Sequence, residues 1–108
     1  MANEPKPIYS TLGDNTQLHE AISKFIIALA EKVDSLQDAE RSGDLQLLRS
    51  LAESTGGEAK TLGYACLTEQ TDLIREACIR DKPELAQAAL MDLTALCTRI
   101  RLGHRGAA

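Results

Sequence analysis

The stretch SGDLQLLRSLAESTGGEAKTLG, residues 42–63, is the most informative part of this 108-residue chain. Gly43 suits the left-handed position just after a helix, and Asp44 can cap the next helix. Leucines then follow at helical spacing, and the expected second helix reaches Gly56 and Gly57. A glycine inside a helix costs about 1 kcal/mol relative to alanine. Two adjacent glycines therefore either end this helix or serve a purpose of their own.

The residues before this stretch predict one long helix behind an N-terminal arm. Residues 1–13 contain two prolines and a glycine, and are expected to form an arm with at most a short turn around residues 8–12. Asp14 or Thr16 is a candidate N-cap of the first helix. Apolar residues then recur at helical spacing until about Arg41: Leu18, Ile22, Phe25, Ile26, Leu29, Val33 and Leu36.

Two further helices are expected after the glycine-containing helix. One covers residues 62–80 and begins after a turn at Gly63 or with a fresh cap at Thr68. The other begins near Pro83, which suits the first turn of a helix. Because links this short force successive helices to run antiparallel, the sequence predicts an all-α protein, an up-down-up-down antiparallel four-helix bundle. The bundle is expected over residues 14–102, with the apolar stripe of its last helix at Leu85, Ala89, Leu93, Leu96 and Ile100, and a flexible tail at 103–108.

The composition limits the class of protein. Hydrophobic residues make up 44% of the chain, but Tyr9, Phe25 and Tyr64 are its only aromatic residues, so aliphatic side chains must fill the core. This suits packed helices better than a sheet. The net charge of -4 argues against nucleic acid or a membrane surface as a partner, because both bind basic surfaces. Neither a signal peptide nor a membrane span is apparent, so a cytoplasmic protein is expected.

The residues that bind metals or act as nucleophiles elsewhere form no known pattern here. The cysteines, Cys66, Cys78 and Cys97, have no C-x-x-C spacing and are expected to be reduced, buried, apolar residues. The two histidines, His19 and His104, are not spaced to complete a zinc site and are expected on the surface. We therefore expect no catalytic residue, no metal and no cofactor, and the chain is not expected to be an enzyme.

Four short motifs lie between residues 43 and 63, and the resemblance that they carry covers about residues 18–100. They are a Gly43-Asp44 link, Leu51-Ala52 on the following helix, the glycine at position 57, and Leu62-Gly63 at the exit. Together they resemble the histidine-containing phosphotransfer (HPt) domains of bacterial phosphorelays, which carry Ala-His-x-x-Lys-Gly on this helix. In that family the histidine accepts a phosphoryl group from the aspartate of a receiver domain. The resemblance implies a four-helix bundle that acts in two-component signal transduction.

The chain departs from the HPt motif at both of its functional side chains. Glu53 stands where the phosphoacceptor histidine is expected, and Gly56 stands where the lysine is expected. A carboxylate would repel the approaching phosphoryl group, so phosphotransfer through Glu53 is not expected. The resemblance therefore implies a module that docks response-regulator receiver domains or a histidine kinase without carrying phosphate. Its implied docking surface comprises Arg49, Ser50, Glu53, Gly56, Gly57 and Lys60.

Helix geometry argues that neither histidine replaces the missing one. In an antiparallel pair hinged near Gly43, Glu53 lies opposite about Lys32, which leaves His19 about thirteen residues, or ~20 Å, further along the first helix. Along the last helix, His104 lies about twelve residues, or ~18 Å, beyond the residue that is level with Glu53.

The glycine pair has two interpretations. Either the glycines keep the helix surface beside Glu53 bare so that a partner's backbone can approach, or Gly56 ends the helix and the residues after it form a loop. The HPt pattern favours the first interpretation, because in that pattern the helix continues through this point.

The function also has two interpretations. The alternative to a signalling module is a structural or oligomerisation bundle that has lost receiver contact. Ile27 beside Ile26 widens the apolar face of the first helix beyond what a four-helix core needs. A monomer or a weak homodimer is expected.

Overall fold

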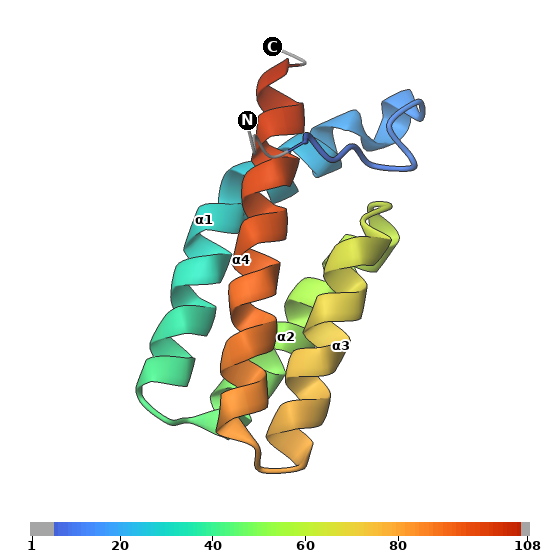
Figure 1. Cartoon of the computed structure of the whole chain (residues 1–108). Coiled ribbons are helices and arrows are strands. Elements are labelled where there is room, and N and C mark those ends of the chain that lie inside the picture. The colour runs from blue at the N-terminus through green and yellow to red at the C-terminus, as the bar shows by residue number, and fades with distance from the viewer. Residues whose placement is uncertain (1–5, 107–108) are drawn as a thin grey trace.

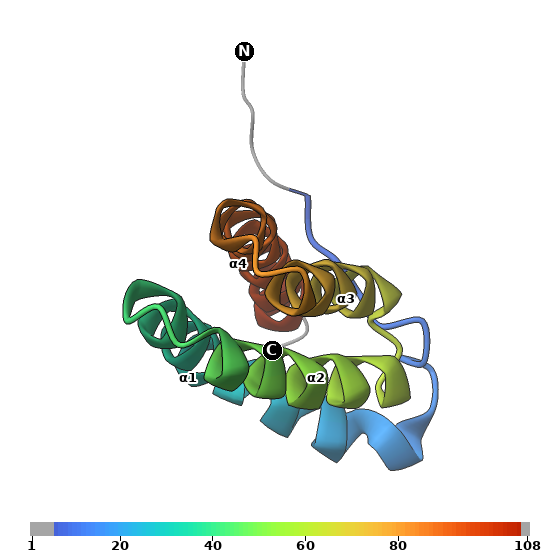
Figure 2. The same ribbon diagram turned by 90° about the horizontal axis from the view of Figure 1, so that it is seen from below.

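The computed structural model describes residues 6–106, which form an all-α up-down bundle behind an N-terminal arm (Figure 1). A short 3-10 helix at Thr16–Leu18 leads into α1 (His19–Arg41), and α2 (Leu45–Thr61), α3 (Ala65–Ile79) and α4 (Pro83–Gly106) follow. Each helix packs on the next, and α4 packs back on α1. Figure 2 shows α1 and α2 on one side of the bundle and α3 and α4 on the other. The predicted fold is confirmed.

The links between the helices have the conformations that their residues favour. Gly43 has a φ of +76°, and the Asp44 carboxylate accepts a hydrogen bond from the backbone N–H of Leu47 at 3.0 Å. The link between α2 and α3 turns at Gly63, whose φ is +85°, while Thr68 lies inside α3. Positive φ values are open to glycine without the steric cost that other residues meet. The predicted turns at Gly43 and Gly63 are confirmed. Of the two alternatives for the start of α3, the turn at Gly63 is correct and the cap at Thr68 is wrong.

The core consists mostly of aliphatic side chains from all four helices, with Phe25 and Tyr64 as its aromatic members. Small residues on α2 and α4, among them Ala52 and Ala86, are fully buried and let neighbouring helices approach closely. Among residues 6–106, no helix is long and apolar enough to cross a membrane. The largest side chains with almost no exposed surface are Leu29, Leu36, Leu48, Leu67, Ile74, Leu93 and Ile100.

The predicted apolar stripe of α4 is wrong at its first member. Leu85 is 52% exposed, whereas Ala86 and Leu90 are buried. The buried face of α4 therefore begins at Ala86, one residue later than expected. Further along the helix it includes Leu93 and Ile100, as predicted. Ala86, Leu90 and Leu93 are spaced four and three residues apart and so share one face of α4, whereas Leu85 is turned about 100° away from Ala86.

The N-terminal arm crosses one end of the bundle, from the end of α4 to the link between α2 and α3 (Figure 1). The Ile8 N–H donates to the Arg99 carbonyl, and the Thr11 N–H donates to the Gly63 carbonyl, both at 3.0 Å. Gly103 lies so close to the arm that a Cβ at this position would stand 2.5 Å from the Ile8 carbonyl oxygen. Residues 6–13 of the arm thus pack on the bundle, and the turn lies at residues 11–14.

Two expected boundaries are wrong. The tail expected at 103–108 is helical as far as Gly106, because the arm packs over the turn of α4 that contains Gly103; residues 107–108 lie outside the described part of the chain. Neither Asp14 nor Thr16 caps the first helix. Asn15 instead caps the 3-10 helix by accepting a hydrogen bond from the Gln17 N–H at 3.0 Å. The first five residues of the expected arm are likewise outside the described part.

Candidate functional site

Helix α2 continues without interruption through Gly56 and Gly57 to Thr61. The interpretation that the glycines end this helix is therefore wrong. Their positions in the helix differ by one residue, which turns them about 100° apart around its axis. The two glycines consequently meet different surroundings.

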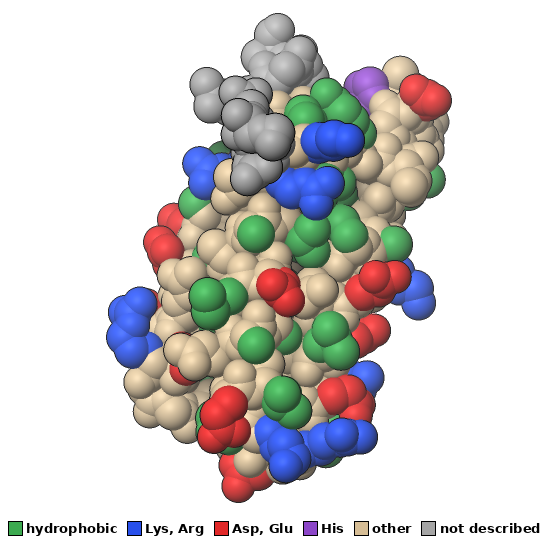
Figure 3. All heavy atoms as spheres, viewed as in Figure 1, with side chains coloured by type: hydrophobic (Ala, Val, Ile, Leu, Met, Phe, Trp, Pro, Cys, Tyr) green, Lys and Arg blue, Asp and Glu red, His purple; other side chains and the backbone are tan. Residues whose placement is uncertain are grey.

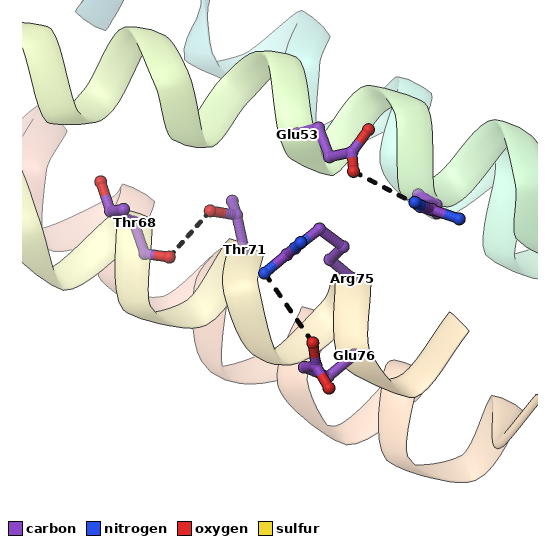
Figure 4. Close-up of polar contacts among 6 residues, drawn as sticks. Glu53, Thr68, Thr71, Arg75 and Glu76 are labelled. Carbon is purple, nitrogen blue, oxygen red and sulfur yellow. Dashed lines mark hydrogen bonds and ion pairs between the residues drawn. The ribbon is translucent and has the colours of Figure 1, made fainter. Parts of the chain in front are cut away.

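Gly56 is buried against α3. A Cβ at this position would overlap the Thr71 hydroxyl and lie 3.1 Å from the Thr71 Cβ. The Thr68 hydroxyl donates to the Gly56 carbonyl at 3.2 Å. The Thr71 hydroxyl in turn donates to the Thr68 carbonyl at 3.0 Å, as Figure 4 shows. Gly56 therefore belongs to the contact between α2 and α3. Its expected place on the docking surface is wrong, because its surface is covered by α3.

Gly57 faces solvent, beside Glu53. No atom lies within 4 Å of a Cβ built at Gly57. Glu53 precedes it by one helical turn and is also exposed. The Arg49 Nε donates to the Glu53 carboxylate at 3.4 Å (Figure 4). The two side chains are 48% and 45% exposed, so this ion pair contributes only about 0–1 kcal/mol to stability.

Five of the six predicted site residues lie on one exposed side of α2. Their positions fall within about a third of the helix circumference, as 100° per residue requires. Glu53 lies near the centre of this side, and Gly57, which carries no side chain, follows one turn later. We call it the α2 face: Arg49, Ser50, Glu53, Gly57 and Lys60.

A shallow groove of about 670 Å³ runs between α2 and α1 beside this face. Glu53 and Gly57 line it from α2, and the small residue Ala28 lines it from α1. Lys32 lines the same groove as Glu53, as the antiparallel register predicts. Its Nζ lies 2.7 Å from the Glu58 carboxylate, which is also on α2.

The sequence analysis did not include the α1 side of this groove in the site. Lys24 and Lys32 line the groove with positively charged side chains. Ala21 and Ala28 line it with small side chains that do not fill it. These residues are 25 or more positions away from Gly57 in the sequence. The only sequence signal for them is the register of two antiparallel helices joined by the link at Gly43.

Both histidines lie outside the groove. His19 is exposed and its Nε2 is 2.5 Å from the Gly13 carbonyl oxygen, whereas His104 is half-buried. The predicted surface position is therefore confirmed for His19 and wrong for His104, which lies where the arm covers α4. The two histidines line a separate cavity beneath the N-terminal arm.

The three cysteines are free thiols, and only one of them is buried as expected. Cys97 is buried in the core, while Cys66 and Cys78 are partly buried. Burial raises the pKa of the Cys97 thiol to about 12 and also raises the pKa of Cys78. Among the residues that the structure describes, no group of three or more His, Cys, Asp or Glu side chains could hold a metal ion.

We expect Cys97 to resist alkylation in the folded protein. The thiolate is the reactive form, and a pKa of about 12 leaves very little thiolate at pH 8.5. Since the folded pKa lies above the unfolded one, this thiol also contributes stability below pH 9 that is lost as the pH rises toward 12. Iodoacetamide labelling followed by mass spectrometry should leave Cys97 unmodified without denaturant and modify all three cysteines in urea. Rapid labelling of Cys97 in the folded protein would contradict its place in the core.

Comparison with protein-family models, with curated proteins and with solved structures gives no match for this chain. Its function is therefore inferred from the geometry of α2 and from the motif residues that this helix carries.

Proposed function

We propose that this chain is an HPt-like signalling module that docks a receiver domain or a histidine kinase through the α2 face without carrying phosphate itself. The observation that supports this proposal is the bare surface at Gly57. A Cβ there would touch nothing in the chain, so packing leaves room for alanine, although glycine weakens the helix by about 1 kcal/mol. Close approach of a partner to α2 explains why position 57 carries a glycine.

The position of Gly57 relative to Glu53 also supports the proposal. The two residues are one turn apart on the same side of an up-down bundle, with the spacing of the histidine and the glycine in the HPt motif. Ala28 across the groove is small, so a partner element can approach the helix backbone there. Two ion pairs, Lys24–Glu20 and Lys32–Glu58, lie at or beside the groove, and their charges can orient a polar partner.

The same groove lacks a group that could accept phosphate from a receiver. Among its described lining residues, Glu53 occupies the acceptor position and no imidazole is present. A carboxylate repels the phosphoryl group, and an acyl phosphate formed on it would be as labile as the donor. A receiver charged with radiolabelled phosphate should therefore transfer no label to this chain, and label at Glu53 would contradict the proposal.

Docking through the α2 face predicts a strong effect of a long side chain at Gly57. In a binding assay against a panel of purified receiver and kinase domains, we expect Gly57→Arg to weaken binding at least about tenfold, because the arginine blocks close approach. The matched control is Ala95→Arg, which adds the same charge at an exposed position on α4. Equal affinity of the two variants, or no binding to any domain in the panel, would count against docking through this face.

A structural or oligomerisation bundle is the second candidate function, and the exposure of Ile27 favours it. This side chain is 70% exposed on α1. Figure 3 shows further hydrophobic side chains between charged ones on the side of α3 and α4, where Leu73, Leu85 and Met91 are more than half exposed. Light scattering should detect a dimer that Ile27→Glu dissociates if this candidate is correct. A monomer at every concentration would exclude it.

A further inference from the structure

A cavity of about 400 Å³ lies beneath the N-terminal arm and is separate from the α2 face. The arm, the start of α1, the end of α4 and the link between α2 and α3 all contribute to it. Its walls are mostly apolar, and the aliphatic ones come from Ile8, Ile22 and Ile26. Cavities of about 300–1,000 Å³ with apolar walls and a few polar groups are typical of small-molecule sites. This cavity is near the lower end of that range, so it suits a small ligand.

Tyr64 lines this cavity and carries a hydroxyl that can donate a hydrogen bond. The residue is only 3% exposed, and its ring stacks on Phe25 with 6.0 Å between ring centroids. Within the part of the chain that the structure describes, the Tyr64 hydroxyl makes no hydrogen bond, whereas the neighbouring Ser10 hydroxyl donates to the Leu62 carbonyl. Burial raises the pKa of Tyr64, so its hydroxyl stays protonated and able to donate. The hydroxyl keeps some exposed surface, so water or a ligand can accept its hydrogen bond.

The two histidines determine the charge of the ligand that this cavity suits. No Asp, Glu, Lys or Arg is among the described residues that line it, so His19 and His104 are its only side chains able to carry a positive charge. The His19 Nε2 must donate to the Gly13 carbonyl, since a carbonyl only accepts. An imidazole N–H donates to a carboxylate, and no Asp or Glu among the described lining residues competes for it.

We propose that this cavity binds a small monocarboxylic acid with an aliphatic body. The Tyr64 hydroxyl and the His104 imidazole donate to its carboxylate, and the isoleucine side chains surround its hydrocarbon part. Burial of an aliphatic chain supplies most of the affinity, and the donors select the head group. This site is independent of docking through the α2 face.

The test compares three probes that share one hydrocarbon chain: octanoate, octan-1-ol and octylamine. Calorimetric titration at pH 7 should detect octanoate, with octan-1-ol several-fold weaker and octylamine undetected. In amide NMR spectra, octanoate should shift signals of residues 8–13, the start of α1 and the end of α4. Octan-1-ol that binds as tightly as octanoate, or octanoate shifts confined to other regions, would overturn the proposal.

Tyr64→Phe is the sharpest variant, because it keeps the ring against Phe25 and removes only the hydroxyl. We expect the variant to fold as the wild type does and to bind octanoate about tenfold more weakly, the loss typical of a hydrogen bond to a charged group. His104→Ala should weaken octanoate binding without changing octan-1-ol binding. Thr98→Val, which removes an exposed hydroxyl elsewhere on α4, is the control. Unchanged octanoate affinity in both Tyr64→Phe and His104→Ala would overturn the assignment.

Discussion

Replacing Gly56 by leucine is expected to lower the free energy of unfolding by about 3 kcal/mol, whereas the same change at Gly57 is expected to raise it by up to about 1 kcal/mol. Leucine is a better helix residue than glycine at both positions. At Gly56, however, even a Cβ overlaps the Thr71 hydroxyl, so α2 and α3 must separate. At Gly57 the added side chain meets open space. Urea unfolding followed by circular dichroism at 222 nm measures both changes.

A change in the facing residue distinguishes this explanation from a general loss of helix. Thr71→Ala removes the hydroxyl that a Cβ at Gly56 would overlap. The double variant Gly56→Ala/Thr71→Ala should therefore lose less stability than the sum of its two single variants. Additive effects, or equal signs for leucine at Gly56 and Gly57, would contradict the close contact between α2 and α3.

Leu29→Ala is expected to lower the free energy of unfolding by about 3–5 kcal/mol. Leu29 has no exposed surface, and its removal leaves a cavity among the core side chains in addition to the lost transfer free energy. Domains of this kind are stable by about 5–15 kcal/mol, so the variant should be close to unfolding at moderate temperature. Thermal and urea unfolding give the measurement.

Ile27→Ala is the matched control, because Ile27 stands two residues earlier on the same helix and is 70% exposed. Its change should stay within about 0.5 kcal/mol, as is usual for surface positions. Similar losses for the two variants would mean that α1 is rotated about its axis, or that Ile27 is buried in a dimer.

The sequence predicted the helices and links because these depend on neighbouring residues. Apolar spacing identified the four helices, and Gly43, Asp44 and Pro83 marked where they end or begin. The sequence pattern wrongly placed Leu85 in the core instead of Ala86. Both residues are apolar, and hydrophobicity alone favours the larger leucine side chain as the buried one. Gly56 was open to interpretation as a helix end, because its partner Thr71 lies fifteen residues later on another helix.

The candidate site was predictable where it lies on one helix. Glu53 and Gly57 share a side of α2 because they are four residues apart, which is a property of helix geometry alone. The cavity beneath the arm was not predictable, because Ile8 and His104 are brought together by the fold across almost the whole chain. No local pattern in the sequence indicates which helix end the arm will cover.

The most direct test of the docking proposal is an amide NMR titration of the isotopically labelled protein with the receiver or kinase domain that binds it most tightly in the panel. The α2 face and the facing side of α1, which includes Lys24 and Lys32, should give the largest shifts, and Gly57→Arg should abolish them. Shifts that instead centre on α3 and α4, or that persist unchanged in Gly57→Arg, would contradict docking through α2.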